Sequence, residues 1–271
     1  MYLSLAKELL NQEYQKYREN VKNNYFLSII DEKIRHSYQV LGVGNFLLRH
    51  EEILSSGKVG QKSYLQAMAL LHDVGRFYEM AVREKGLAVD HGVYGAELLS
   101  ETKYFNAIDF TLPIKHHGHM IKQLYEDDAY QSLPLDMREK VEKSCFFVRD
   151  ADKLANYYLL MSNFEEMKLL FCNSLEFGTN QTKAVSADVL DGFFQHRAIL
   201  KETVYSLADK VLFFIAWIFD LNYVSSFVFL QKLDIIPRLF SLFSEYLDEN
   251  TALRCKVEAE NFILSKLNSA K

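Results

Sequence analysis

Hydrophobic residues recur at helical spacing along nearly the whole chain. Between Leu3 and about Val21, apolar side chains form one stripe and charged side chains occupy the other positions, which is the pattern of an amphipathic helix. Only three prolines and eleven glycines interrupt the chain, and no Asn-Gly or Asp-Gly turn separates two segments of alternating hydrophobicity. The pattern therefore predicts an all-α protein.

The same periodicity predicts further helices with few long interruptions. They are expected over residues 32–54, 63–72, 91–99, 105–117, 136–171, 187–200, 201–220, 223–247 and 251–268. Asp90 is a suitable N-cap for the helix that starts at His91, and Asp136 with Glu139 has the form of a capping box. Residues 174–186 form the longest polar interruption, which we interpret as a loop over or beside a site because its flanks are equally apolar.

Composition narrows the classes of partner. The chain is 49% hydrophobic and 25% charged, as in ordinary globular proteins, and its net charge is −5. Because proteins that bind a nucleic-acid backbone need a basic face, we expect no nucleic-acid polymer as partner. The longest apolar run, residues 211–219, is shorter than the roughly 20 residues that span a bilayer, and the N-terminal segment lacks the apolar stretch of a signal peptide. We therefore expect no membrane partner.

The cysteines give a weaker indication of compartment. Cys145, Cys172 and Cys255 are odd in number and lack the CxxC spacing of metal fingers and redox motifs. Such thiols are typical of reduced, cytosolic proteins. The sequence therefore predicts a cytoplasmic protein.

One apolar stretch contains two residues that do not suit a hydrophobic core. The segment Ala69-Leu70-Leu71-His72-Asp73-Val74-Gly75-Arg76-Phe77 places a histidine beside an aspartate. An unpaired buried charge is costly, so this pair needs partners. Imidazole nitrogens and carboxylate oxygens suit Fe, Mn, Zn or similar ions. Taken alone, the pair is a weak signal for a metal, because a helix-end histidine hydrogen-bonded to its neighbour gives the same pattern.

The order of further histidines and aspartates resembles a known family. His36, His72-Asp73 and Asp152 follow the arrangement His…His-Asp…Asp, and the segments IRHSYQVLGVGNFL, ALLHDVGRF and RDADKLAN extend the likeness beyond the ligands. The set resembles the HD-domain superfamily of metal-dependent phosphohydrolases over residues 36–156. His91 and the pair His116-His117 resemble the extra histidines of members that have a two-metal site.

This resemblance implies a fold and two sets of metal ligands. The fold would be an HD-domain-like helical bundle: a single domain over residues 1–271, with a metal-binding core over 30–160 and a helical C-terminal extension over 161–271 packed on that core. One divalent ion would be held by His36, His72, Asp73 and Asp152. A second would be held by His91, His116 and His117, with Asp73 bridging the two. The donor types leave the metal open among Fe, Mn, Zn, Co and Ni.

Two aspartates could be the last metal ligand of the motif. Asp150 and Asp152 are two residues apart and would point about 200° apart on a helix, so only one of them can face the site. The resemblance favours Asp152. Glu79 has two interpretations, as a partner of a ligating histidine or as a surface carboxylate.

The resemblance also implies residues that act on a substrate. Arg76 and Lys153 neighbour expected ligands and carry positive charge, so both are candidates for phosphate binding and catalysis alongside Asp73. Asn156 lies one helical turn beyond Asp152, and His119 lies two residues beyond His117; both are candidate substrate contacts. Each of these four is also compatible with an ordinary surface or capping role.

The resemblance implies that the protein hydrolyses a small-molecule phosphate ester by metal-activated water. The expected substrate is a nucleotide. Two ions about 3.5–4 Å apart can clamp a phosphoryl oxygen and lower the pKa of bound water toward about 7. Whether the substrate is a phosphomonoester or a phosphodiester stays open. The alternatives are a di-iron oxygenase of the same superfamily and a non-catalytic nucleotide-binding or regulatory module. The apolar C-terminal helices make a homodimer an additional expectation.

Overall fold

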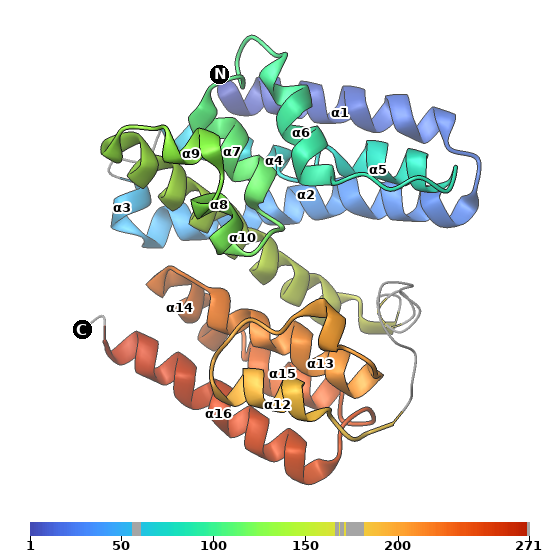
Figure 1. The fold of residues 1–271 in the computed structure, drawn as a ribbon, viewed down its shortest axis with the longest axis vertical. Coiled ribbons are helices and arrows are strands. Elements are labelled where there is room, and N and C mark those ends of the chain that lie inside the picture. The colour runs from blue at the N-terminus through green and yellow to red at the C-terminus, as the bar shows by residue number, and fades with distance from the viewer. Residues whose placement is uncertain (56–60, 166–167, 169–170, 172–181, 270–271) are drawn as a thin grey trace. The chain divides into compact units, whose positions relative to one another are not determined.

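The structure is a computed structural model that describes residues 1–55, 61–165, 168, 171 and 182–269. Every regular element among these residues is a helix, of α or 3-10 type, and none is a strand (Figure 1). The all-α prediction is confirmed. The polar segment 174–186, expected to be a loop near the site, lies largely outside the described residues.

The chain divides into two compact units, Met1–Ala155 and Asn156–Lys271. The predicted metal-binding core falls almost entirely in the first unit, and the predicted extension falls in the second. The expectations of a single domain and of an extension packed on the core stay predictions.

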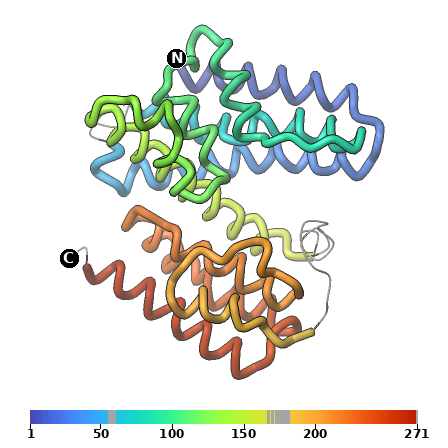
Figure 2. The backbone as a smooth tube through the Cα atoms, viewed as in Figure 1, coloured from blue at the N-terminus to red at the C-terminus, as the bar shows by residue number. Residues whose placement is uncertain are grey.

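The first unit is built around a short, buried helix. α1 (Tyr2–Asn20) and α2 (Asn24–His50) run antiparallel, and α4 (Lys62–Leu71) packs against both of them (Figure 2). The residues of α4 from Ala67 to Leu71 are all buried, and a helix that is apolar on all sides belongs in a core. The C-terminal end of α4 therefore delivers His72 and Asp73 into the interior of the unit.

The remaining helices of the first unit are shorter, apart from the last. They are α3 (Glu52–Ser55), α5 (Arg76–Arg83), α6 (His91–Ser100), α7 (Ile108–His116), α8 (Ile121–Tyr125), α9 (Asp128–Gln131) and α10 (Leu135–Ser162), whose last turns belong to the second unit. α5 packs on α1 and α2, and α6 packs on α7. A smaller apolar cluster joins α7 to α10 through Leu112, Leu124, Tyr130, Val141 and Cys145.

Several helix boundaries differ from the predicted ones. α2 begins at Asn24 instead of residue 32, because the Asn23 side chain accepts a hydrogen bond from the Tyr25 amide at 2.9 Å and caps the helix. Residues 76–83 form α5, which was not predicted. α10 begins at Leu135, so Asp136 lies in its first turn and is not its N-cap. The predicted cap Asp90 is confirmed, because its carboxylate accepts a hydrogen bond from the Val93 amide at 3.0 Å.

The second unit is also helical. Its described elements are α12 (Ala187–Phe194), η1 (Lys201–Thr203), α13 (Leu207–Ile215), η2 (Ala216–Asp220), α14 (Val224–Lys232), α15 (Ile235–Leu242) and α16 (Glu249–Asn268). The single helix predicted over 223–247 is two helices, because Asp234 adopts a left-handed backbone with φ of 49°. Within this unit, α16 packs on α14 and α15, and α12 packs on α13.

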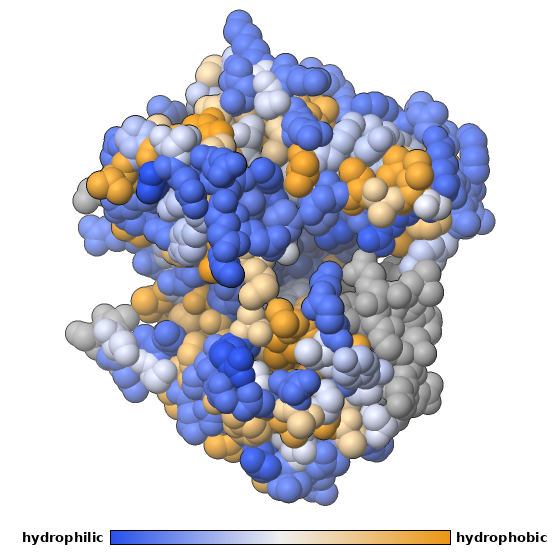
Figure 3. Space-filling model, in the orientation of Figure 1, coloured by the Kyte–Doolittle hydropathy of each residue, from blue (hydrophilic) through white to orange (hydrophobic). Residues whose placement is uncertain are grey.

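Polar side chains cover most of the visible face of the first unit, with smaller hydrophobic patches between them (Figure 3). Among the described helices, none combines the length and the apolar character that crossing a membrane requires.

Candidate metal centre

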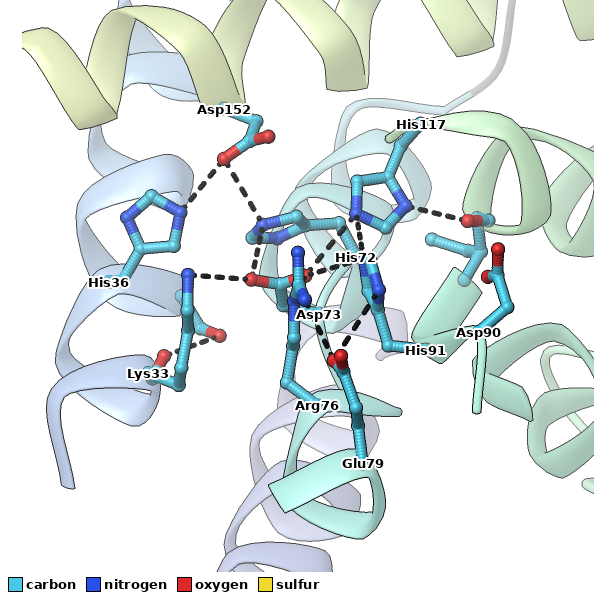
Figure 4. A network of polar contacts seen from close by, with 12 residues as sticks. Lys33, His36, His72, Asp73, Arg76, Glu79, Asp90, His91, His117 and Asp152 are labelled. Atoms are coloured by element: carbon cyan, nitrogen blue, oxygen red, sulfur yellow. Dashed lines mark hydrogen bonds and ion pairs between the residues drawn. The ribbon is translucent and has the colours of Figure 1, made fainter. Parts of the chain in front are cut away.

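Six residues of the first unit that were expected to bind metal converge at the ends and faces of five helices (Figure 4). The structure brings together His36 on α2, His72 and Asp73 after α4, His91 at the start of α6, His117 after α7 and Asp152 on α10. Five of the six are buried or nearly so, whereas the Asp152 side chain is 23% exposed. The cluster is therefore interior, with Asp152 on its accessible side.

Two glycines allow the three short segments around His91 to meet. A Cβ atom on Gly75 would lie 2.1 Å from the carbonyl oxygen of His91, and a Cβ atom on Gly92 would lie 2.5 Å from that of Lys115. No side chain can be placed at either position without moving backbone. The absence of side chains at Gly75 and Gly92 therefore lets His91 lie between Asp73 and the end of α7.

His36, His72 and Asp152 form the first group that could hold an ion. His36 Nε2 lies 2.8 Å from Asp152 Oδ1, and His72 Nε2 lies 3.6 Å from the same oxygen. These residues come from three different helices, so the group forms only in the folded unit. Of the two competing aspartates, Asp152 is the one in this group.

His72, Asp73 and His117 form a second group that could hold an ion, and His91 adjoins it. Asp73 Oδ1 lies 3.3 Å from His91 Nε2 and 3.3 Å from His117 Nε2, and the two imidazole nitrogens lie 3.2 Å apart. Nitrogen ligands at about 2.1 Å from a tetrahedral ion are about 3.4 Å from one another. The separation of His91 and His117 therefore suits two ligands of one ion.

Backbone hydrogen bonds orient two of the imidazoles. His72 Nδ1 lies 2.9 Å from the carbonyl oxygen of Ala69, and His117 Nδ1 lies 2.7 Å from that of Ile114. A carbonyl only accepts, so each Nδ1 carries the hydrogen and each Nε2 directs its lone pair toward the cluster. His72 Nε2 is buried and has no hydrogen-bond partner within the described part of the chain. A buried lone pair that lacks a donor fits a metal ion, and this arrangement is the usual support of metal-binding histidines.

Basic side chains keep Asp73 ionised. Burial alone would raise the pKa of Asp73, but the charges of Lys33, His72 and Arg76 outweigh burial and hold the pKa well below its usual value. Lys33 Nζ lies 3.3 Å from Asp73 Oδ2, and Arg76 Nε lies 3.3 Å from Asp73 Oδ1. Asp73 is therefore available as a carboxylate ligand across the physiological pH range.

The histidines of the cluster differ in their preferred charge. Burial and the nearby charge of Arg76 hold the pKa of His91 well below its usual value, and burial likewise lowers the pKa of His36. Burial would also lower the pKa of His72, but the carboxylates of Asp73 and Asp152 outweigh it and raise that pKa. His91 and His36 are thus neutral, as metal ligation requires, whereas the two carboxylates favour a proton on His72 that a bound metal ion would displace from Nε2.

Glu79 is buried and supports the cluster from α5. Its carboxylate accepts a hydrogen bond from Arg76 Nη1 at 2.7 Å and lies 3.6 Å from His91 Nδ1. The side chain is only 2% exposed. Of the two interpretations of this residue, the surface carboxylate is wrong and the partner of a histidine fits the geometry.

His116 does not join the cluster, contrary to the expectation that it would bind the second ion. Consecutive residues project about 100° apart at a helix end, so with His117 facing inward His116 points to a different side of α7. There His116 Nε2 lies 2.9 Å from Asp127 Oδ2. His119, an expected substrate contact, lies 3.2 Å from His116 through their Nδ1 atoms and 2.7 Å from Asp90 Oδ2 through its Nε2. The structure thus places both imidazoles in a bracing network beside the cluster.

This network predicts an acid-sensitive contribution to stability. Burial would raise the pKa of Asp127, but hydrogen bonds from Lys115 and His116 lower it to about 2. The depression from 3.8 corresponds to roughly 2 kcal/mol, which is present above the ordinary pKa and lost as the pH falls through about 2. Asp127→Asn should therefore lower the free energy of unfolding by roughly 2 kcal/mol at pH 7 and by about half as much near pH 3.

Urea denaturation of wild type and variant at several pH values measures this difference. Asp128→Asn is a matched control, because Asp128 is the adjacent carboxylate and is exposed; its effect should stay within about 0.5 kcal/mol. A difference between wild type and Asp127→Asn that does not change with pH would contradict the assignment.

A buried arginine joins the end of α7 to α10. Arg149 Nη1 donates to the carbonyl oxygens of His116 and His117 at 3.2 and 3.0 Å, and also to that of His119. The last carbonyls of a helix have no partner within the helix. Arg149 therefore binds the terminus that carries His117 to the helix that carries Asp152.

Lys153 and Asn156, two further candidates for substrate contacts, lie on α10. Lys153 is adjacent to Asp152 and only 8% exposed, and Asn156 is one turn beyond it. Their roles toward a substrate stay predictions. Arg76 lies within the cluster, in contact with Asp73 and Glu79.

The sequence analysis missed three residues that shape the centre: Lys33, Arg149 and Asp127. The first two had a usable signal, because each lies three residues before an expected ligand on the same helix and so on the same face, Lys33 before His36 and Arg149 before Asp152. Asp127 had no such signal. It reaches His116 only through the chain reversal between α7 and α9.

The fold and this cluster together define an all-α protein with histidine and aspartate groups suited to a metal ion. Residues 34–157 match the family model of the HD domain, and this span contains all six converging residues. Residues 34–157 are therefore an HD domain, and the resemblance to the HD-domain superfamily of metal-dependent phosphohydrolases is confirmed over this part of the chain. Comparisons with curated proteins and with solved structures find no match.

Proposed function

We propose that this protein is a metal-dependent phosphohydrolase that cleaves the phosphate ester of a nucleotide, a small-molecule substrate. It would use two divalent metal ions, each of them Fe, Mn, Zn, Co or Ni. The observation that carries the proposal is the convergence of His36, His72, Asp73, His91, His117 and Asp152 around the buried Nε2 atom of His72, which has no hydrogen-bond partner among the described residues. Such a set of imidazole nitrogens and carboxylate oxygens is a typical binuclear donor set.

The two overlapping groups suggest how the ligands are shared. His36, His72 and Asp152 would serve one ion, His91 and His117 the other, and Asp73 lies where its two oxygens can serve both. Bound ions would supply an activated water at neutral pH and polarise the phosphoryl oxygens.

The chain itself contributes positive charge and orientation. Lys33 and Arg76 each lie 3.3 Å from Asp73, on its two oxygens. Once Asp73 is shared with metal, these cations are placed to attract the phosphate, and the planar guanidinium of Arg76 matches phosphate oxygens in pairs. Glu79 holds Arg76, and the carbonyls of Ala69 and Ile114 hold two imidazoles, so the orientation exists before the substrate arrives.

Metal content tests the binuclear part of the proposal. We expect two ions per chain, by elemental analysis, in wild type purified without chelator. His117→Ala should lower this toward one ion, because its Nε2 is a donor to the second group. His50→Ala is the matched control, since His50 is exposed and its described contacts are with Phe46 of its own helix; it should keep both ions. One ion in both wild type and His117→Ala would contradict the binuclear site.

Turnover tests the reaction. The metal-loaded protein is assayed with Mn or Fe for phosphate release from nucleoside mono-, di- and triphosphates and for opening of cyclic nucleotides. We expect activity that a chelator abolishes and added metal restores. A loaded protein that hydrolyses none of these, or that turns over only with oxygen consumption, would contradict the proposal and favour a binding module or a di-iron oxygenase, respectively.

A further inference from the structure

The last helix of the second unit exposes an apolar stripe on the side facing away from its own core. Leu253, Val257 and Leu264 on α16 are 60%, 47% and 46% exposed. Cys255, Ala259 and Ile263, on another face of the same helix, are buried. The exposed stripe is therefore not part of the packing of the unit.

The spacing of this stripe is that of a helix that pairs with another helix. Residues 253, 257, 260, 264 and 267 are separated by alternating steps of four and three, and all but Glu260 are apolar. At 100° per residue these five positions fall within about 80° of the helix surface. Alternating four-three spacing is the pattern of a coiled-coil seam, and it extends over more than three turns of α16, a single continuous helix (Figure 1).

A groove runs beside the apolar stripe of α16 and could receive the corresponding stripe of another helix. Two hollows of about 220 and 230 Å³ lie between α15 and α16 and share Pro237 in their linings. Leu253 borders the first and Leu264 borders the second, and Phe240 and Ile236 contribute apolar side chains from α15. Hydrophobic side chains reach the surface of the second unit (Figure 3). The same face of the second unit thus carries both the protruding apolar stripe of α16, which we call the ridge, and the hollows beside it.

The order of charges on this face is complementary to that of a second copy in antiparallel orientation. Lys256 borders the first hollow, whereas Glu260 and Asp234 border the second. In a parallel pair, Glu260 would face its own copy and the like charges would repel. In an antiparallel pair, Leu253 faces Leu264 of the other copy, Val257 faces Glu260, and Lys256 lies beside Glu260 of the other copy. Both arrangements bring the two stripes together, but only the antiparallel one places opposite charges beside each other.

We propose that the protein forms a two-fold symmetric dimer through antiparallel contact of α16 with α16 of a second copy. A two-fold interface uses the same patch on both subunits, so the patch must be complementary to itself. The ridge, the groove and the order of charges on α16 meet this requirement. The proposal is independent of the phosphohydrolase function, because every residue it uses lies in the second unit.

Mass in solution tests the dimer. Wild type should show, by light scattering or sedimentation equilibrium, twice the chain mass of 31.6 kDa. Leu264→Glu buries two charges, one on each copy, and should raise the dimer dissociation constant by about 100-fold while the helical circular dichroism stays unchanged. Leu200→Glu is the matched control, because Leu200 lies in the same unit with 50% exposure and is not part of α16. Wild type that is monomeric at every concentration, or a dimer that Leu264→Glu leaves intact, would overturn the proposal.

Charge reversal tests the orientation. Lys256→Glu and Glu260→Lys should each weaken the dimer, since each places like charges together across the axis. The double variant restores opposite charges and should recover most of the wild-type affinity, with the pair within one helix also restored. A double variant that dimerises no better than either single one would overturn the antiparallel arrangement.

Discussion

Replacing Asp73 with asparagine should remove bound metal and abolish turnover. Asp73 is the only one of the six converging residues whose carboxylate contacts both sides of the cluster: its Oδ1 atom lies 3.3 Å from His91 and His117, and its Oδ2 atom lies 3.6 Å from His72. Asparagine keeps the shape and loses the charge. We expect metal content to fall from two ions toward none, and kcat/KM to fall by at least about 10³-fold, because the water is no longer activated.

The same substitution should change stability in the metal-free protein. Lys33 and Arg76 would lose their shared anion, and an unpaired buried charge is costly. Both side chains are partly exposed, at 20% and 27%, so we expect a loss of about 2 kcal/mol and not the full cost of a buried pair. Urea denaturation in the presence of chelator measures this effect separately from metal binding.

A control carboxylate separates the two effects from general loss of charge. Asp31→Asn removes a partly exposed carboxylate that pairs with Arg18, and it should keep metal, turnover and stability near wild type. Folded Asp73→Asn protein that retains two ions would contradict the assignment of Asp73 as the shared ligand, whatever its activity.

The parts of the fold that the sequence predicted best are those that depend on local periodicity. α1, α6 and α16 lie within a few residues of their predicted bounds, because each has a clear apolar face and, for the last two, an aspartate cap. α5 was missed because Gly75 resembles a helix terminator, yet its backbone is ordinary helical. The glycine is needed for close packing, which no local pattern reveals.

The candidate site shows the same division. His36, His72, Asp73 and Asp152 could be chosen from the sequence because their order and neighbouring residues resemble a family. Both His116 and His117 were predicted as ligands, and the sequence could not show that only His117 joins the cluster, since the two are adjacent at the end of one helix and only tertiary contacts decide which faces inward. His117 is oriented by its hydrogen bond to the Ile114 carbonyl, and His116 by its contact with Asp127. Asp127 is the N-cap of α9, so this second contact depends on another helix.

The second large effect is expected from one added methyl group. In Gly75→Ala the new Cβ atom would meet the His91 carbonyl oxygen at 2.1 Å and the Gly95 amide nitrogen at 2.8 Å. Both are backbone atoms, so no side-chain rotation relieves the overlap, and α6 must move away from the turn that carries His72 and Asp73. Overpacking of this kind costs about 3 kcal/mol or more, which corresponds to a fall in Tm of roughly 6–12 °C for a protein of this size.

The same movement should affect the two ions unequally. His91 is the first residue of α6, so displacement of this helix withdraws one ligand from the group shared with Asp73 and His117, while His36, His72 and Asp152 stay together. We expect Gly75→Ala to fold at low temperature with one ion per chain and less than about a tenth of the wild-type turnover. Gly42→Ala is the matched control: a Cβ atom there meets nothing within 4 Å, and alanine in the middle of α2 should stabilise the protein by up to about 1 kcal/mol. If Gly75→Ala matched Gly42→Ala in stability and kept both ions, the close approach of the Gly75 turn to α6 could not be what places His91.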